Sequence, residues 1–137
     1  GKEDAATRQL QLQAYERLAL FLERIHPREL ITRVYQTGMT VRDLQTGLIA
    51  SVHMEFEHNL SQQIYVSHQV WKTVQGVKEQ ELNMINQVAS KLNPEGPAKE
   101  LHQRIIDFIM TTENDLPVEV GLNIINTEAK MVLSQQG

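Results

Sequence analysis

Residues 70–92 read VWKTVQGVKEQELNMINQVASKL, and the spacing of the apolar side chains in this stretch decides the fold class. These side chains recur every three or four residues, which is the period of an amphipathic helix. The face that they form extends over about six helical turns, and it comprises Val70, Trp71, Val74, Val77, Leu82, Ile85, Val88, Ala89 and Leu92. We therefore expect the central helix of an all-helical domain here, with Trp71 in the core rather than on a binding surface.

The same periodicity predicts helices on the N-terminal side of this stretch. A first helix of about 20 residues ends before Pro27, because proline disfavours helical backbone in the preceding residue. A shorter helical turn over 28–36 follows, and Gly38 breaks it. The second helix begins after Thr40, which forms a capping-box pattern with Asp43. The apolar stripes comprise Leu10, Ala14, Leu18, Phe21, Leu22 and Ile25 in the first helix, and Val41, Leu44, Leu48 and Val52 in the second.

The remaining segments complete the predicted bundle. The β-branched and aromatic run 64–66 favours a kink or an extended connection over 59–67, after which Ser67 caps the central helix. Two prolines and a glycine make 93–97 a loop, and Pro117 begins the last helix. The fourth helix contains Leu101, Ile105, Phe108 and Ile109, and the fifth contains Val118, Leu122, Ile125, Ala129, Val132 and Leu133. We predict a single all-α domain over 1–137, with about five helices in an up-and-down or orthogonal bundle.

Composition and charge exclude some kinds of functional site and argue against nucleic acid as a ligand. The chain has no cysteine, which excludes disulfides, thiolate metal sites and a cysteine nucleophile. Its net charge of -4 argues against nucleic-acid binding. The first 42 residues carry seven basic against five acidic side chains, and the rest carries six against twelve. This basic N-terminal third is typical either of a segment near a membrane or anionic partner, or of a helix with mixed surface charge.

Signatures of familiar enzymes do not occur in this sequence. The seven glycines are too dispersed for a phosphate-binding loop, and there is neither a nucleophile-elbow serine nor a His-Glu-x-x-His zinc helix. These observations favour a protein without catalysis and without a cofactor, although they leave an enzyme with an unfamiliar site open.

One polar cluster stands at the end of the second helix. Continuing its apolar stripe beyond Val52 leads to Glu55 and Asn59, so a carboxylate and an amide point where core side chains are expected. His58, Gln62 and Gln63 lie close by in the sequence. Buried polar groups need partners. We interpret these five residues as a hydrogen-bonded network that fixes the kink between helices, or as a ligand pocket.

The same cluster also raises the question of a metal site. Glu55 and His58 form one Glu-x-x-His pattern, and His53 lies four residues from Glu57. Di-iron bundle proteins need a second such pattern and two further carboxylates, and the sequence holds no second copy. We therefore predict no metal and regard surface histidines or salt bridges as the better explanation.

Two longer runs suggest a family. Residues 12–25, LQAYERLALFLERI, and residues 55–67, EFEHNLSQQIYVS, resemble a family of uncharacterised Bacteroidota proteins that is classed as a domain of unknown function. The resemblance covers residues 9–92 and extends only loosely over the last two helices. Members of that family typically begin with one membrane-spanning segment and a short basic stretch, which implies a helical domain at the cytoplasmic face of the inner membrane.

The chain begins at Gly1 without an initiator methionine, so we expect Gly1 to be a cloning or protease scar and a native N-terminal anchor to have been removed ahead of it. Leu12 and Leu20, which lie off the first apolar stripe, are candidates for a second contact surface. Together these features predict a membrane-tethered interaction or scaffold module that binds a protein partner or itself. The alternative is a helical-bundle enzyme, or a protein that binds a metal or small ligand through Glu55, His58 and Asn59.

Overall fold

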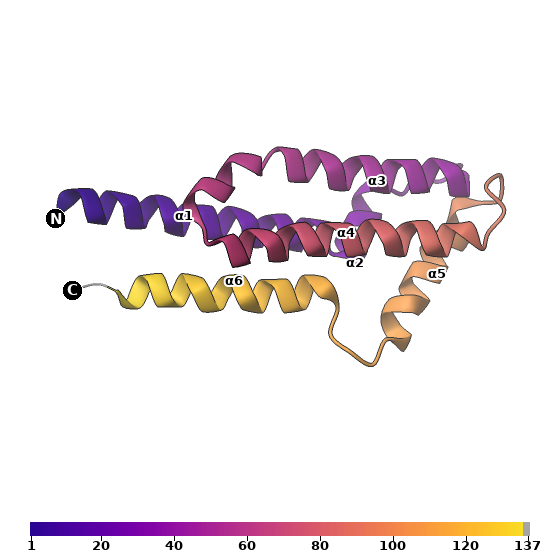
Figure 1. Cartoon of the computed structure of the whole chain (residues 1–137). Coiled ribbons are helices and arrows are strands. Elements are labelled where there is room, and N and C mark those ends of the chain that lie inside the picture. Colours follow the sequence, from indigo (N-terminus) through magenta and orange to yellow (C-terminus); the bar gives the residue numbers. More distant parts are fainter. Residues whose placement is uncertain (136–137) are drawn as a thin grey trace.

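The computed structural model describes residues 1–135 and is helical throughout, apart from connecting segments (Figure 1). The long helices are α1 (Lys2–Ile25), α3 (Val41–Glu57), α4 (His68–Ser90) and α6 (Pro117–Ser134). Three shorter ones are α2 (Pro27–Val34), the 3-10 helix η1 (Leu60–Tyr65) and α5 (Ala98–Thr111). The described part of the chain has no strand, only one isolated bridge between Thr40 and Pro97. The predicted all-helical single domain is confirmed.

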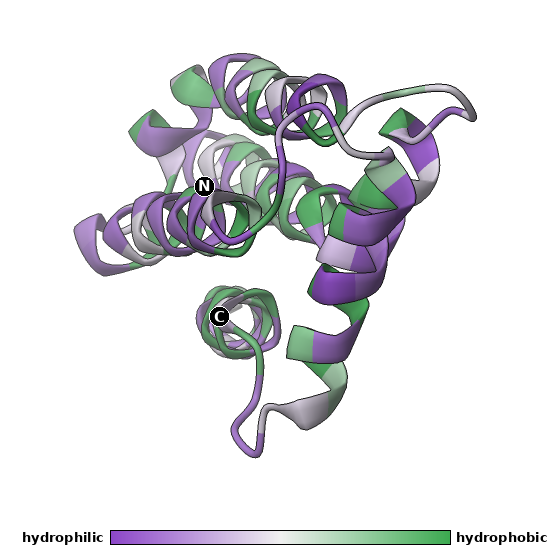
Figure 2. Ribbon diagram, turned by 90° about the vertical axis from the view of Figure 1, so that its right-hand side faces the viewer, coloured by the Kyte–Doolittle hydropathy of each residue, from purple (hydrophilic) through white to green (hydrophobic). Residues whose placement is uncertain are grey.

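The four long helices run along one axis, and α5 crosses one end of the bundle (Figures 1 and 2). Helix α1 packs along α6, so the start of α1 and the end of α6 lie together at the opposite end of the bundle. Helix α4 contacts α1, α3, α5 and α6. It is therefore the central helix that its apolar face predicted.

The predicted number of about five helices is too low, because the described residues form six α-helices and one 3-10 helix. Proline has no backbone N–H and disfavours helix before it, so the backbone turns at His26 and restarts as the separate helix α2. The kink expected over 59–67 contains the 3-10 helix, which ends at extended backbone in Val66.

Local sequence signals set the helix starts. The capping box between Thr40 and Asp43 is present, with each side chain accepting a hydrogen bond from the other residue's backbone N–H. Ser67 caps α4 by accepting from the Val70 N–H, and Pro117 occupies the first turn of α6. These three predictions are confirmed.

The core follows the predicted stripes with three exceptions. Leu10, Phe108 and Leu133 are exposed, although their spacing placed them with buried neighbours. Leu10 and Leu133 lie toward the end of the bundle where α1 starts and α6 ends, and Phe108 lies near the end of α5. Leu20, one of the two off-stripe leucines, is exposed, whereas Leu12 packs partly against the core.

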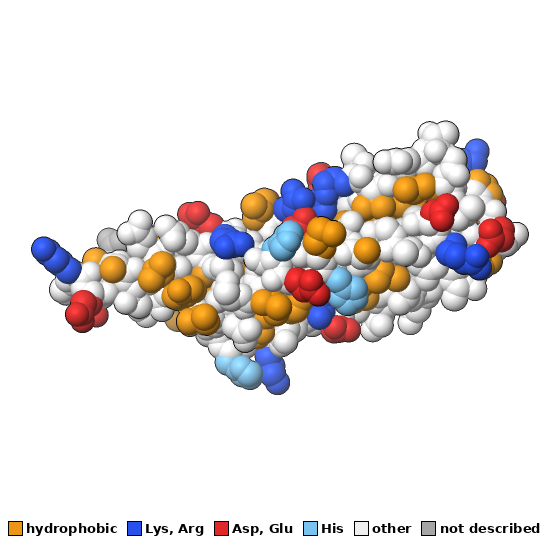
Figure 3. Space-filling model, turned by 90° about the horizontal axis from the view of Figure 1, so that it is seen from above, with side chains coloured by type: hydrophobic (Ala, Val, Ile, Leu, Met, Phe, Trp, Pro, Cys, Tyr) orange, Lys and Arg blue, Asp and Glu red, His pale blue; other side chains and the backbone are white. Residues whose placement is uncertain are grey.

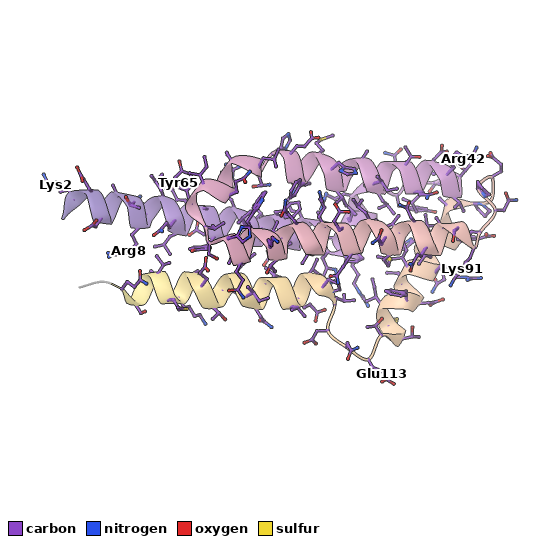
Figure 4. The ribbon with its side chains drawn as sticks, in the orientation of Figure 1. Lys2, Arg8, Arg42, Tyr65, Lys91 and Glu113 are labelled. Carbon is purple, nitrogen blue, oxygen red and sulfur yellow. The ribbon has the colours of Figure 1, made fainter. Side chains whose placement is uncertain are left out.

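A polar contact ties α1, α4 and α6 together near that end. The Tyr15 hydroxyl donates to Glu128 Oε2 at 2.6 Å, and the Ser67 N–H donates to the same oxygen at 3.2 Å. Burial of the Glu128 carboxyl would raise its pKa, but the hydrogen bonds from Ser67 and Tyr15 outweigh it and lower the pKa. At the same end, Arg8 donates to the Gln135 carbonyl (Figure 4).

Gly121 permits a close approach of α6 to α1 and α4. A Cβ atom at this position would lie 2.9 Å from Leu22 Cδ1 on α1 and 3.0 Å from Val77 Cγ2 on α4. Both neighbours are buried and cannot move without disturbing the core. By contrast, a Cβ at Gly76 in the middle of α4 meets nothing within 4 Å.

We expect Gly121→Ala to destabilise the fold by about 1 to 2 kcal/mol, because the methyl group overpacks the junction of three helices. Gly76→Ala is the matched control and should stabilise it by about 0.5 to 1 kcal/mol through helix propensity alone. Urea unfolding of both variants measures the two effects. Equal effects of the same sign would contradict the close approach at Gly121.

Candidate functional site: a pocket around Glu81

A cavity of about 280 Å³ lies between α4, α5 and the start of α6. Helix α5 packs on α2, α3 and α4, whereas α6 packs on α1 and α4. The connection between α5 and α6 loops outward past Glu113 before α6 begins (Figures 2 and 4). The hollow therefore lies where α5 and α6, which both pack on α4, diverge from each other.

The walls of this pocket are mostly apolar. They include Val77, Met84, Phe108, Ile109, Leu116 and Val118. Polar side chains without charge, namely Gln80, Asn83, Gln87 and Thr112, also line it, and all four reach solvent to some extent. An apolar wall with a few polar groups is the usual composition of a small-ligand site.

Glu81 is the single ionisable residue among the described residues that line the pocket. It lies four residues after Val77 and four before Ile85, so the helical period places it on the buried face of α4. Its side chain is only 5% exposed, and its Oε2 atom has no hydrogen-bond partner within the part of the chain that the structure describes. On its inner side it borders Leu30, Leu48 and Ile105.

This environment changes the charge of Glu81. Desolvation by burial raises the pKa of its carboxyl from 4.5 to about 8. Near neutral pH the residue is therefore mainly a neutral carboxylic acid, which can donate one hydrogen bond or give its proton to a base. Titratable groups with strongly perturbed pKa values in clefts are candidates for functional sites.

Glu55, the first of the sequence-predicted site residues, is half-buried and forms ion pairs with arginines. Its Oε1 accepts from Arg24 Nε at 2.8 Å and Arg24 Nη2 at 2.6 Å, and Arg33 Nη2 lies 4.0 Å away. The hydrogen bond from Arg24 is the main reason that the pKa of Glu55 falls below its usual value. The apolar stripe of α3 continues to Phe56, and Glu55 lies at its edge.

The other four predicted residues form hydrogen bonds that are local in the sequence or are made by the backbone. Asn59 is buried and its Nδ2 donates to the Glu55 carbonyl at 2.7 Å. His58 has an exposed side chain, and its carbonyl accepts from Arg17. Gln62 is buried and donates to Ser61 Oγ at 3.3 Å, whereas Gln63 is exposed and donates to the Leu60 carbonyl at 3.0 Å.

Of the predicted residues, Asn59 therefore bonds to the backbone carbonyl of Glu55, not to its carboxyl. The carboxyl of Glu55 pairs instead with two arginines that the sequence analysis did not predict as partners. No group of three or more metal-ligating side chains occurs within residues 1–135. No helix in the same range is both long and apolar enough to cross a membrane.

Sequence reasoning missed two sets of residues. The partners Arg24 and Arg33 lie on α1 and α2, and no local spacing relates them to Glu55. Glu81, however, had a signal, because it falls on the α4 face between Val77 and Ile85. The same stripe argument that singled out Glu55 identifies Glu81 when it is applied to α4.

The fold and the pocket define an all-helical domain with a small apolar cavity. Neither the curated proteins nor the solved structures contain a match to this chain. A family model matches residues 1–132, and its description is a family of unknown function, DUF7935. The chain belongs to this family, and the resemblance to an uncharacterised domain is confirmed to that extent.

Glu81 should make stability fall as pH rises. Its pKa is about 8 in the folded state against 4.5 for the free group, so the unfolded chain loses this proton first. The loss of folding stability caused by Glu81 is absent below pH 4.5, grows between pH 4.5 and 8 and is then constant. Relative to Glu81→Gln, we expect the wild type to lose up to about 5 kcal/mol of unfolding free energy across this window.

Urea unfolding at several pH values tests this expectation. Glu79→Gln is the control, because Glu79 is also a glutamate on α4 but has an exposed side chain. Its pH dependence should follow that of the wild type. Parallel curves for the wild type and Glu81→Gln would show that the carboxyl ionises without penalty.

Glu55→Gln should have a small effect, because its arginine partners are partly solvated. We expect a loss of up to about 1 kcal/mol at pH 7. The Glu55 pKa is lowered, so this contribution is present above pH 4.5 and disappears as pH falls through the folded-state pKa. Glu57→Gln, an exposed neighbour, is the control. A loss above about 2 kcal/mol would favour a buried network at Glu55.

Proposed function

We propose that this domain is a non-catalytic binding module and that its ligand occupies the Glu81 pocket. One observation supports this most directly, namely an apolar hollow of about 280 Å³ with a single, unpartnered carboxyl in its wall. Cavities of this kind are the default binding-site hypothesis in a protein of unknown function.

The composition of the pocket favours binding over catalysis. General acid–base catalysis commonly places two titratable groups, or a nucleophile and a base, within hydrogen-bond reach of one substrate. Among the described lining residues, Glu81 is the only titratable one, and the polar groups Gln80, Asn83, Gln87 and Thr112 are neutral. Such groups orient a ligand but do not transfer protons to it.

The alternative site at Glu55 is less suited to a ligand. Both the fork of Arg24 and the more distant Arg33 already face Oε1 of this carboxylate. A metal or small ligand there would compete with two guanidinium groups. A protein partner, self-association and a location at the cytoplasmic face of the inner membrane stay predictions from the sequence and do not depend on the pocket.

Toluene is a suitable probe, because apolar cavities bind small aromatic hydrocarbons. We expect millimolar toluene to shift the NMR signal of the methyl group of Met84, which lines the pocket, and to leave that of Met54, which is exposed on α3, unchanged. The measurement is a titration of protein carrying carbon-13 in its methionine methyl groups.

Asn83→Trp provides the matched test, because Asn83 is an exposed residue of the pocket lining and an indole at this position should fill the hollow. This variant should lose the Met84 response to toluene. Gln75→Trp, at an exposed position of α4 outside the pocket, should keep it. A wild type without any Met84 response would overturn the proposed pocket.

A further inference from the structure

Glu81 makes no contact that explains its burial. A carboxyl that loses its hydration without gaining a hydrogen bond opposes folding. An apolar side chain of similar length at this position would continue the face formed by Val77 and Ile85 without that cost. The Oε2 atom nevertheless has no partner among residues 1–135. This leaves the Oε2 atom free to pair with a ligand.

We propose that the ligand of this pocket is a compact apolar amine whose nitrogen pairs with the Glu81 carboxylate. This inference rests on the proposed function and adds the chemical class of the ligand. The apolar body would lie against Val77, Met84 and Val118, and the nitrogen would point at the wall of α4.

Charge complementarity selects an amine over other ligands. An anion would be repelled by an ionised Glu81, and a neutral alcohol offers one ordinary hydrogen bond. An ammonium group forms charge-assisted hydrogen bonds, which are stronger in a site of low polarity. Phe108 lines the same pocket and retains exposed ring surface, which is a second feature that attracts cations.

The size of the cavity favours a free amine over the lysine side chain of a partner protein. A lysine side chain is a narrow chain of four methylene groups, whereas the cavity has a volume of about 280 Å³ and so leaves space around such a chain. Unfilled apolar space next to a ligand forfeits dispersion contacts. A ring with a short aminomethyl arm fills the hollow and still reaches the carboxyl.

Other charged groups near Glu81 belong to different surfaces. Lys78, one turn earlier on α4, lies over the Phe56 ring at 4.0 Å and pairs with Glu79. Asp115 lines the neighbouring groove beside Gly121, and His26 lines the groove formed by α1 and α2. The residues from α2, α3, α4, α5 and α6 that border Glu81 directly carry no further ionisable group. The charge of the site therefore depends on Glu81 itself.

Binding of the amine releases a proton near neutral pH. The amine arrives as the ammonium ion and Glu81 starts as the neutral acid. Formation of the ion pair transfers the Glu81 proton to solvent, so that one ammonium ion and one acid give one ion pair and one proton. The affinity should therefore rise with pH and level off only above about pH 8, where the free carboxyl becomes mainly ionised.

Benzylamine and benzyl alcohol are the matched probes, since they share a ring and differ in the basic nitrogen. We expect benzylamine to bind at least about tenfold more tightly than the alcohol at pH 8. Titration calorimetry in two buffers of different ionisation heat should show the release of about one proton per amine at pH 6.5. Glu81→Gln should abolish the preference, the proton release and the pH dependence.

Three controls separate the outcomes. Glu79→Gln should bind both probes as the wild type does, because its side chain is exposed. Glu81→Met offers an apolar replacement in case the amide variant does not fold, and the wild-type pH profile requires no variant at all. The amide of Nα-acetyl-lysine stands for the lysine side chain of a partner protein. If it binds as tightly as benzylamine, the choice of a free amine is overturned.

Failure of this inference differs from failure of the proposed function. Equal affinity for amine and alcohol, unchanged in Glu81→Gln, would overturn the amine and leave the pocket as a binding site. Absence of binding by both probes, together with an unresponsive Met84 methyl group, would overturn both proposals.

Discussion

The apolar face of α4 is the constraint on which the rest of the structure depends. Helices α1, α3, α5 and α6 all pack against α4, and its residues Val74, Val77 and Ile85 are buried among them. The burial of such faces supplies most of the stability of a helical domain, because isolated helices of this length are marginal in water. The face seen in Figure 3 shows the complementary pattern, with hydrophobic side chains in separate groups among polar ones.

Glu81 interrupts this face beside the pocket. On one side it borders core residues such as Leu48 and Ile105, and on the other it borders the hollow between α5 and α6. A fully closed interface around an unpaired carboxyl would be costly, because neither water nor protein would solvate it. The divergence of α5 and α6 and the polar residue on α4 are thus two parts of one arrangement.

Much of the fold followed from local rules. The breaks at Pro27 and Gly38, the capping box at Thr40 and the cap at Ser67 depend on residues within one turn of each other, so a single sequence reveals them. Such local rules did not predict that Leu10 and Phe108 are exposed. Their helical spacing is correct, but their exposure depends on where neighbouring helices end, which is a property of the tertiary structure.

The candidate sites also combine features that local sequence rules predict with features that depend on the tertiary structure. Nothing in the sequence relates Glu55 to Arg24, because 31 residues separate them and only the packing of α1 beside α3 brings them together. The spacing of apolar residues along a helix can locate a carboxyl on its apolar face, but the direction of the pKa shift depends on the partners of that carboxyl. Glu55 lies at the edge of its stripe and reaches two arginines, so its pKa falls. Glu81 lies within its stripe and reaches none, so its pKa rises. Two glutamates with the same local pattern therefore have opposite electrostatic character, and the one without a partner in the chain is the better candidate for binding something outside it.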